Sequence, residues 1–94
     1  MKTYLIDGSR IDSMADFFAE VGRAVNGDGG YFGSNLDALA DCLRGGFGTP
    51  DEGGFRFVLA PYKDVRAALG EPAWSTLLRV FADNGADLWL ANAA

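Results

Sequence analysis

The chain has 94 residues, of which 13 are acidic and 8 are basic, so its formal net charge is −5 at pH 7. This length predicts one domain, residues 1–94, which buries somewhat more than about 60% of its unfolded surface. The acidic balance disfavours direct nucleic-acid binding and favours a basic protein partner. Histidine is absent, which removes the commonest general base and the commonest metal ligand.

The single cysteine, Cys42, excludes an internal disulfide. The charge of its neighbour Asp41 disfavours the thiolate, so we expect an unreactive residue at the edge of the core. The amino-terminal residues lack the apolar stretch of a secretory signal, and no later segment approaches the length of a membrane span. We therefore expect a cytoplasmic protein that is monomeric when free and needs no cofactor or metal.

The first third of the chain predicts a strand followed by a helix. Residues 2–6 alternate loosely between polar and apolar side chains and end at the turn dipeptide Asp7-Gly8. The pattern Ser13-x-x-Asp16 predicts a helix start, and the helix should stop before Gly27. Its apolar side chains share one side: Met14, Phe17, Phe18, Val21 and Val25. The loop 26–30 is rich in residues that tolerate positive φ.

A second helix is predicted after this loop, ending at Gly45-Gly46. The residues at i, i+3, i+4 and i+7 form its buried side: Leu36, Leu39, Ala40 and Leu43. Asp37, Asp41 and Arg44 fall on an outward stripe, where the two acids have Cβ atoms roughly 5–6 Å apart and repel each other. Each acid also has an explanation that involves no binding partner. The form Ser34-x-x-Asp37 indicates a capping box, which explains Asp37 alone. Asp41 lies beyond the first turn and is by default a solvated surface charge.

The second half of the chain predicts two further strands and two helices. The glycine-rich segment 48–54 forms a connection, and the apolar run 55–60 before Pro61 predicts a central strand covered on both faces. A short helix is expected over 65–69. The last helix should begin with Pro72 at its first position. Its core candidates are Leu77, Leu78, Val80 and Phe81.

The third strand is expected over 86–91, with Trp89 filling the core. Strands separated by helices imply right-handed crossovers. The predicted fold class is therefore α/β, with a small three-stranded parallel sheet packed with about four helices.

Three segments together resemble a known family. The run 31–46 combines a Tyr-aromatic-Gly start with Asn35-Leu36-Asp37-Ala38-Leu39 and Asp41-Cys42-Leu43. It resembles the inhibitory loop and helix of the barstar family of ribonuclease inhibitors. The segment 4–8 with Ile11 resembles the family's first strand and helix, and the segments 77–81 and 85–90 resemble its last helix and strand. Nearly the whole chain is covered.

The resemblance implies an intracellular bacterial inhibitor that forms a 1:1 complex with a small, basic, secreted ribonuclease. It implies that Asp41 enters the phosphate site of the enzyme and that Asp37 pairs with a second basic group. Tyr31 would pack over a catalytic histidine of the enzyme, while Gly33 and Asn35 shape the loop. The implied ribonuclease-binding residues are Tyr31, Phe32, Gly33, Asn35, Leu36, Asp37, Ala38, Asp41, Arg44 and Gly45.

The chain departs from the family pattern at several contact positions. Ala40 and Gly46 stand where the best-known member carries tryptophans, and Ser75 stands where it carries a glutamate. Glu71, one turn earlier, is a candidate substitute for that acid. Arg44 replaces a small polar residue, and it could either neutralise Asp41 or pair with an acid on the partner.

Two other functional classes remain open. Asp37 and Asp41 have a spacing near the roughly 5–5.5 Å of retaining glycosidases. Both acids, however, project from one helix face without a predicted cleft, so we expect no catalytic residues and no enzyme. The other alternative is a barstar-like immunity or interaction module for a partner that is not a ribonuclease.

Overall fold

The computed structural model describes residues 2–50 and 54–93. Its elements are, in chain order, β1 (Lys2–Asp7), the 3₁₀ turn η1 (Gly8–Arg10), α1 (Met14–Asn26), α2 (Leu36–Leu43), β2 (Phe55–Ala60), α3 (Lys63–Leu69), α4 (Ala73–Asp83) and β3 (Asp87–Leu90). Three parallel strands and four α-helices in the described part confirm the predicted α/β fold class. None of these helices is both long and apolar enough to span a bilayer.

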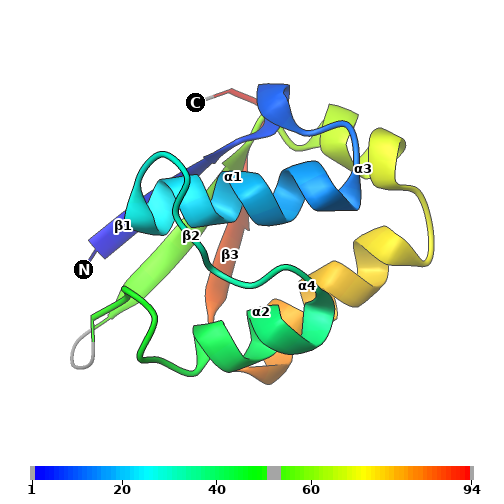
Figure 1. Ribbon diagram of the computed structural model, residues 1–94. Coiled ribbons are helices and arrows are strands. Elements are labelled where there is room, and N and C mark those ends of the chain that lie inside the picture. The colour runs from blue at the N-terminus through cyan, green and yellow to red at the C-terminus, as the bar shows by residue number, and fades with distance from the viewer. Residues whose placement is uncertain (1, 51–53, 94) are drawn as a thin grey trace.

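The three strands form one sheet in the order β1-β2-β3, with β2 in the centre as predicted. Both strand pairs are parallel, and Val58 lies opposite Leu5 on one side and Trp89 on the other. In Figure 1, α1 crosses one face of the sheet, and α2 and α4 lie next to each other on that same side. The helices therefore cover a single face, and the core lies between them and the strands.

Aromatic rings from four elements build this core. Phe57 of β2 stacks edge-on against Phe81 of α4 at 5.4 Å between ring centroids, and Phe17 of α1 contacts the same Phe81 ring at 6.3 Å. Phe32, from the loop before α2, lies 6.0 Å from Phe57. All four rings are fully buried, so they join the sheet, α1, α4 and the α2 loop in one packing unit.

The opposite face of the sheet is open, which overturns two predictions. Side chains alternate between faces along a strand, and the row Leu5, Val58, Trp89 points away from the helices. Trp89 is 55% exposed, with the Arg56 guanidinium 4.4 Å from its ring centroid. The predictions that β2 is covered on both faces and that Trp89 fills the core are therefore wrong. The cause is that β3 is a short edge strand, and none of the helices in the described residues covers its outer face.

The observed ends of α1 agree with the ends predicted from the sequence, and those of several other elements differ by a few residues. The Ser13 side chain accepts from Asp16 N at 3.1 Å, and α1 ends at Asn26 as predicted. The turn η1 was not predicted, α3 begins two residues early, β3 is shorter than 86–91, and α4 starts one residue late at Ala73. Within α4, Leu77 and Phe81 are buried and Leu78 and Val80 half-buried. The predicted connection 48–54 lies partly outside the described residues.

Candidate functional site

Helix α2 is an eight-residue helix that presents its acids to solvent. It begins at Asn35, whose side-chain oxygen accepts from Ala38 N at 2.8 Å. Asn35, and not Ser34, is therefore the N-cap, which corrects the predicted capping box. Leu39 and Leu43 are buried on the side that packs toward α4, while Leu36 and Ala40 are only half-buried.

The two acids of α2 both point away from the protein interior. Asp37 lies in the first turn, where the positive end of the helix dipole favours an acid. Asp41 lies one turn further on, and its side chain is 63% exposed. One of its oxygens, Oδ1, receives a hydrogen bond from Arg44 Nη2. The structure thus brings both predicted acids to one surface, with one oxygen of Asp41 already engaged.

Arg44 joins α2 to the end of α4. Its Nη1 donates to Asn84 Oδ1 at 2.8 Å, in addition to the bond from Nη2 to Asp41. Asn84 ends α4 and is itself held by a bond from its Nδ2 to the carbonyl of Val80 at 2.8 Å. The guanidinium is therefore fixed next to the carboxyl end of α4, where the helix dipole favours a cation.

The loop before α2 carries one exposed and one buried aromatic ring. Tyr31 is exposed beside the helix, whereas Phe32 is completely buried in the core. The expectation that Phe32 lies at a binding surface is therefore corrected, because its side chain anchors the loop instead. Gly33 has φ 92°, and a Cβ there would lie 2.6 Å from Leu39 N. Only glycine allows the loop to pass this close to the backbone of α2.

The loop after α2 contributes an exposed ring that was not predicted, that of Phe47. A single side chain, Asn26 at the end of α1, bonds both loops: its Nδ2 donates to Tyr31 O at 2.8 Å and to Phe47 O at 2.7 Å. Sequence reasoning missed both Asn26 and Phe47. The available signal was an aromatic residue between glycines, Gly46-Phe47-Gly48, which belongs to no amphipathic pattern.

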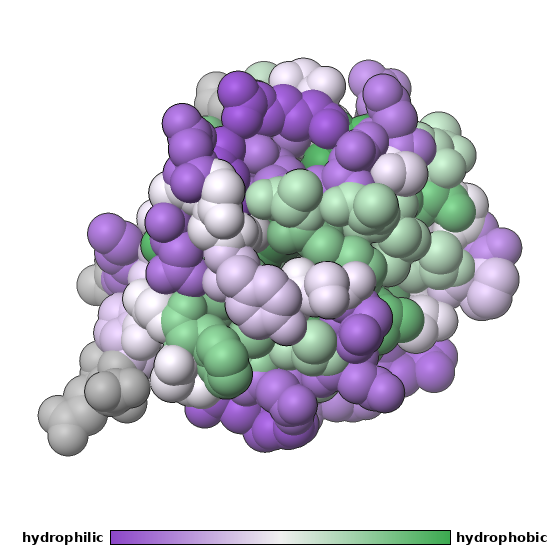
Figure 2. Space-filling view, viewed as in Figure 1, coloured by the Kyte–Doolittle hydropathy of each residue, from purple (hydrophilic) through white to green (hydrophobic). Residues whose placement is uncertain are grey.

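A shallow groove of about 260 Å³ lies between α1 and the loop before α2. It is lined by Ala15, Phe18, Ala19, Gly30, Tyr31, Gly33 and Ser34. Figure 2 shows apolar surface gathered over α1 and continuing toward α2, with hydrophilic residues around it. The acidic stripe of α2 is therefore bordered by apolar and aromatic surface on the side of α1.

Comparison with known families decides which class of protein has this arrangement. A family profile described as Barstar (barnase inhibitor) matches residues 1–92. The chain belongs to the barstar family. A comparison with curated proteins gives no match. The barstar family consists of inhibitors and not of enzymes, and the three-stranded parallel sheet with four helices agrees with the barstar-like fold.

The positions that the resemblance marks as departures from the family pattern lie around α2 and the start of α4. Ala40 is half-buried and Gly46 is exposed with φ 89°, so neither position offers a large ring. Ser75 on α4 is engaged by Glu71, whose carboxylate accepts from Ser75 N at 2.9 Å and from the Ser75 hydroxyl. These hydrogen bonds lower the pKa of Glu71. A carboxylate therefore lies beside Ser75.

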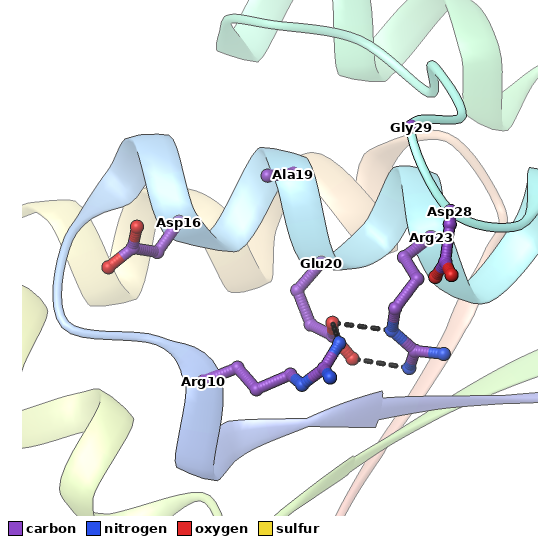
Figure 3. A pocket seen from close by; sticks show the side chains of 7 residues that line it. All are labelled: Arg10, Asp16, Ala19, Glu20, Arg23, Asp28 and Gly29. Carbon is purple, nitrogen blue, oxygen red and sulfur yellow. Dashed lines mark hydrogen bonds and ion pairs between the residues drawn. The ribbon is translucent and has the colours of Figure 1, made fainter.

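A second pocket, of about 270 Å³, lies on the other side of α1 and is lined mainly by charged residues (Figure 3). Its Glu20 is buried and accepts from Arg23 Nε at 2.7 Å, from Arg23 Nη2 at 2.5 Å and from Asp7 N at 2.7 Å. Burial alone would raise the pKa of Glu20, but these bonds and the charges of Arg23 and Arg10 hold it below its ordinary value. The carboxylate joins α1 to β1.

Two remaining features bear on metals and on nucleophiles. Among the residues that the structure describes, no group of three or more acidic or cysteine side chains is placed to hold a metal ion. Cys42 is buried, and burial followed by the charge of Asp41 raises the pKa of its thiol. Cys42 therefore lies within the core and not at its edge as predicted, and the raised pKa agrees with the predicted disfavoured thiolate.

Proposed function

We propose that this barstar-family protein inhibits a small, basic, secreted ribonuclease by placing the Asp41 carboxylate in the phosphate site of the enzyme. The observation that carries the proposal is the joint exposure of Asp37 and Asp41 on α2, whose flanking loops carry the exposed rings of Tyr31 and Phe47. A pocket built for a phosphate holds cationic donors, and a carboxylate offers them the same kind of acceptor.

The charge of the whole molecule supports the same proposal. A protein of formal charge −5 is attracted to a basic enzyme over distances comparable with the Debye length, about 8 Å at physiological salt. This attraction speeds encounter and orients α2 toward the cationic cleft. Raising the salt should therefore slow association strongly and change dissociation much less.

The other residues of the surface have distinct proposed roles. Asp37 pairs with a second basic group, an arginine near the base-recognition loop of the enzyme. Tyr31 packs its ring over a catalytic histidine, and Phe47 supplies apolar contact next to Gly46. The remaining positions, which shape the loop or contact the enzyme through backbone and small side chains, are Gly33, Asn35, Leu36, Ala38 and Gly45.

The test is a titration of barnase, the enzyme in the family's description, with the purified protein while RNA cleavage is followed. We expect stoichiometric 1:1 inhibition by the parent chain. Asp41→Ala should weaken binding by about 3–5 kcal/mol, because it leaves the desolvated cations of the enzyme unpaired. Asp12→Ala is the matched control, since it removes an exposed acid that precedes α1 and leaves α2 unchanged.

The outcomes of this titration separate the candidate functions. An Asp41→Ala variant that inhibits as well as the parent would contradict the phosphate-mimic proposal. If small secreted ribonucleases are not inhibited and a non-nuclease partner co-purifies, the protein is instead an interaction module on a barstar-like scaffold. Ionic-strength-independent association rates would contradict the electrostatic part alone.

A further inference from the structure

The cation beside the proposed phosphate mimic carries a further inference, which rests on the proposed function. Arg44 lies three residues after Asp41, and its side chain is 59% exposed. An arginine has five N–H donors in a fixed planar arrangement. Within the described residues, two of them are used, one from Nη1 to Asn84 and one from Nη2 to Asp41. The others are available to a molecule that covers α2.

The ion pair between Asp41 and Arg44 contributes little to the stability of the free protein, because both side chains are exposed. Exposed ion pairs are worth about 0–1 kcal/mol, because water and salt screen them. The electrostatic energies of both side chains become larger when an enzyme covers this surface and excludes water. Asp41 then gains the cations of the phosphate pocket, but Arg44 is brought toward the same cations and repels them. A covered guanidinium is tolerated only where acceptors satisfy it.

Arg44 is not free to leave the contact region. Asn84 Oδ1 holds Nη1 at 2.8 Å, and Asn84 is fixed in turn by its 2.8 Å bond to Val80 O. The carboxyl end of α4 adds a favourable dipole at this point. In the free protein the guanidinium is therefore held beside Asp41, and Asp41 and Arg44 present a negative and a positive group next to each other.

We propose that Arg44 recognises a carboxylate of the target enzyme, namely a general base adjacent to its phosphate pocket. Cleavage of RNA through the ribose 2′-hydroxyl requires a group beside the phosphate that removes the hydroxyl proton. In an enzyme where this group is a glutamate or aspartate, the active site presents a cation and an anion side by side. The Asp41–Arg44 pair is complementary to that arrangement. Arg44 thus selects ribonucleases with a carboxylate base.

The experiment is a double-mutant cycle with barnase as the probe. On the inhibitor side, the variants are Arg44→Ala, Arg44→Lys and Asn84→Ala. On the enzyme side, each acidic residue of the active site is replaced singly by its amide. Because loss of a catalytic base abolishes activity, binding is measured by titration calorimetry and not by inhibition. Arg66→Ala on α3 is the matched control, since it removes one exposed positive charge at a distance from α2.

We expect Arg44→Ala to weaken binding of the unmodified enzyme at least about tenfold, and to have almost no effect once the catalytic carboxylate is an amide. Arg44→Lys should recover only part of the affinity, because an ammonium lacks the planar pair of donors. Asn84→Ala should weaken binding less than Arg44→Ala, since it frees the guanidinium without removing it. Arg66→Ala should change affinity less than threefold. Thermal denaturation of each variant verifies folding.

The inference fails separately from the proposed function. If Asp41→Ala weakens binding while Arg44→Ala is neutral or tightens it, the recognition of a carboxylate is wrong and the phosphate mimic stands. Coupling of Arg44 to a different acid of the enzyme overturns its assignment to the general base. If the parent chain does not bind barnase at all, both proposals are contradicted together for this enzyme class.

Discussion

Asn26 Nδ2 donates to the carbonyl oxygen of Phe47 at 2.7 Å, although 21 positions separate the two residues. The same nitrogen donates to Tyr31 O at 2.8 Å, so one amide group joins the segments on both sides of α2. A Cβ at Gly48 would overlap the Asn26 side chain, which explains the glycine there. The backbones of the two loops that flank α2 are thus held from the end of α1.

This relationship predicts that Asn26→Asp is destabilising although it changes the side chain by one atom. A carboxylate cannot donate, and it repels the two carbonyl oxygens that the amide satisfied. We expect a loss of about 1–2 kcal/mol in the free energy of unfolding, measured by urea denaturation. Relative to the parent, amide hydrogen exchange should accelerate more in the loops 27–35 and 44–50 than in the strands.

Asn26→Ala serves as the control for charge, because it removes the donors without adding an anion. Both variants should lower stability, with Asn26→Asp the lower of the two. An Asn26→Asp protein as stable as the parent, with unchanged exchange in both loops, would show that the amide does not hold them together.

The start of α2 gives a second prediction, because Asn35 and not Ser34 accepts from Ala38 N. Asn35→Ala should cost about 1 kcal/mol of stability, whereas Asn35→Ser should cost little, since serine also caps helices. Ser34→Ala is the matched control and should leave stability within about 0.5 kcal/mol of the parent. Equal effects of Ser34→Ala and Asn35→Ala in thermal denaturation would contradict this assignment.

The buried Glu20 predicts a pH-dependent contribution to stability. Its folded-state pKa lies below the ordinary value of 4.5, so the unfolded chain binds more protons in this range. The stabilisation is fully present above the unfolded-state pKa and is lost as the pH falls through the folded-state pKa. Glu20→Gln should cost about 1–3 kcal/mol at pH 7, less than a fully buried pair because Arg23 stays partly hydrated.

The stability difference between Glu20→Gln and the parent should remain constant from pH 7 to about pH 6 and shrink below pH 4.5. Comparing the two proteins cancels the titration of acids that lie away from Glu20, such as Glu71, whose pKa is also lowered. Urea denaturation at a series of pH values measures the difference. A difference that grows on acidification would mean that Glu20 is not held as a carboxylate.

The two tryptophans predict opposite fluorescence properties. Trp89 is 55% exposed on the open sheet face, whereas Trp74 is 6% exposed and stacks on Tyr62. A Trp74→Phe protein should emit at long wavelength and be quenched readily by acrylamide, because its one tryptophan is in contact with water. A Trp89→Phe protein should emit at shorter wavelength and resist quenching. Similar quenching constants for the two variants would refute the open face.

Local patterns determined much of this protein. Helix α1 and the strand β2 follow from periodicity and from caps and turns that lie within a few residues of each element. The buried stripe and the exposed acids of α2 follow in the same way, because positions three and four apart share one face of a helix. The run 31–46 was also specific enough to indicate the barstar family, which the match over residues 1–92 confirms.

Tertiary structure alone decided the remaining features. Trp89 is exposed because the helices cover only one face of the sheet, and an apolar residue in a short strand carries no information about that. Phe32 is buried because the loop folds back onto Phe57. The bonds from Asn26 to Phe47 and from Arg44 to Asn84 join residues 21 and 40 positions apart. Such contacts depend on how whole elements pack, and no local periodicity encodes them.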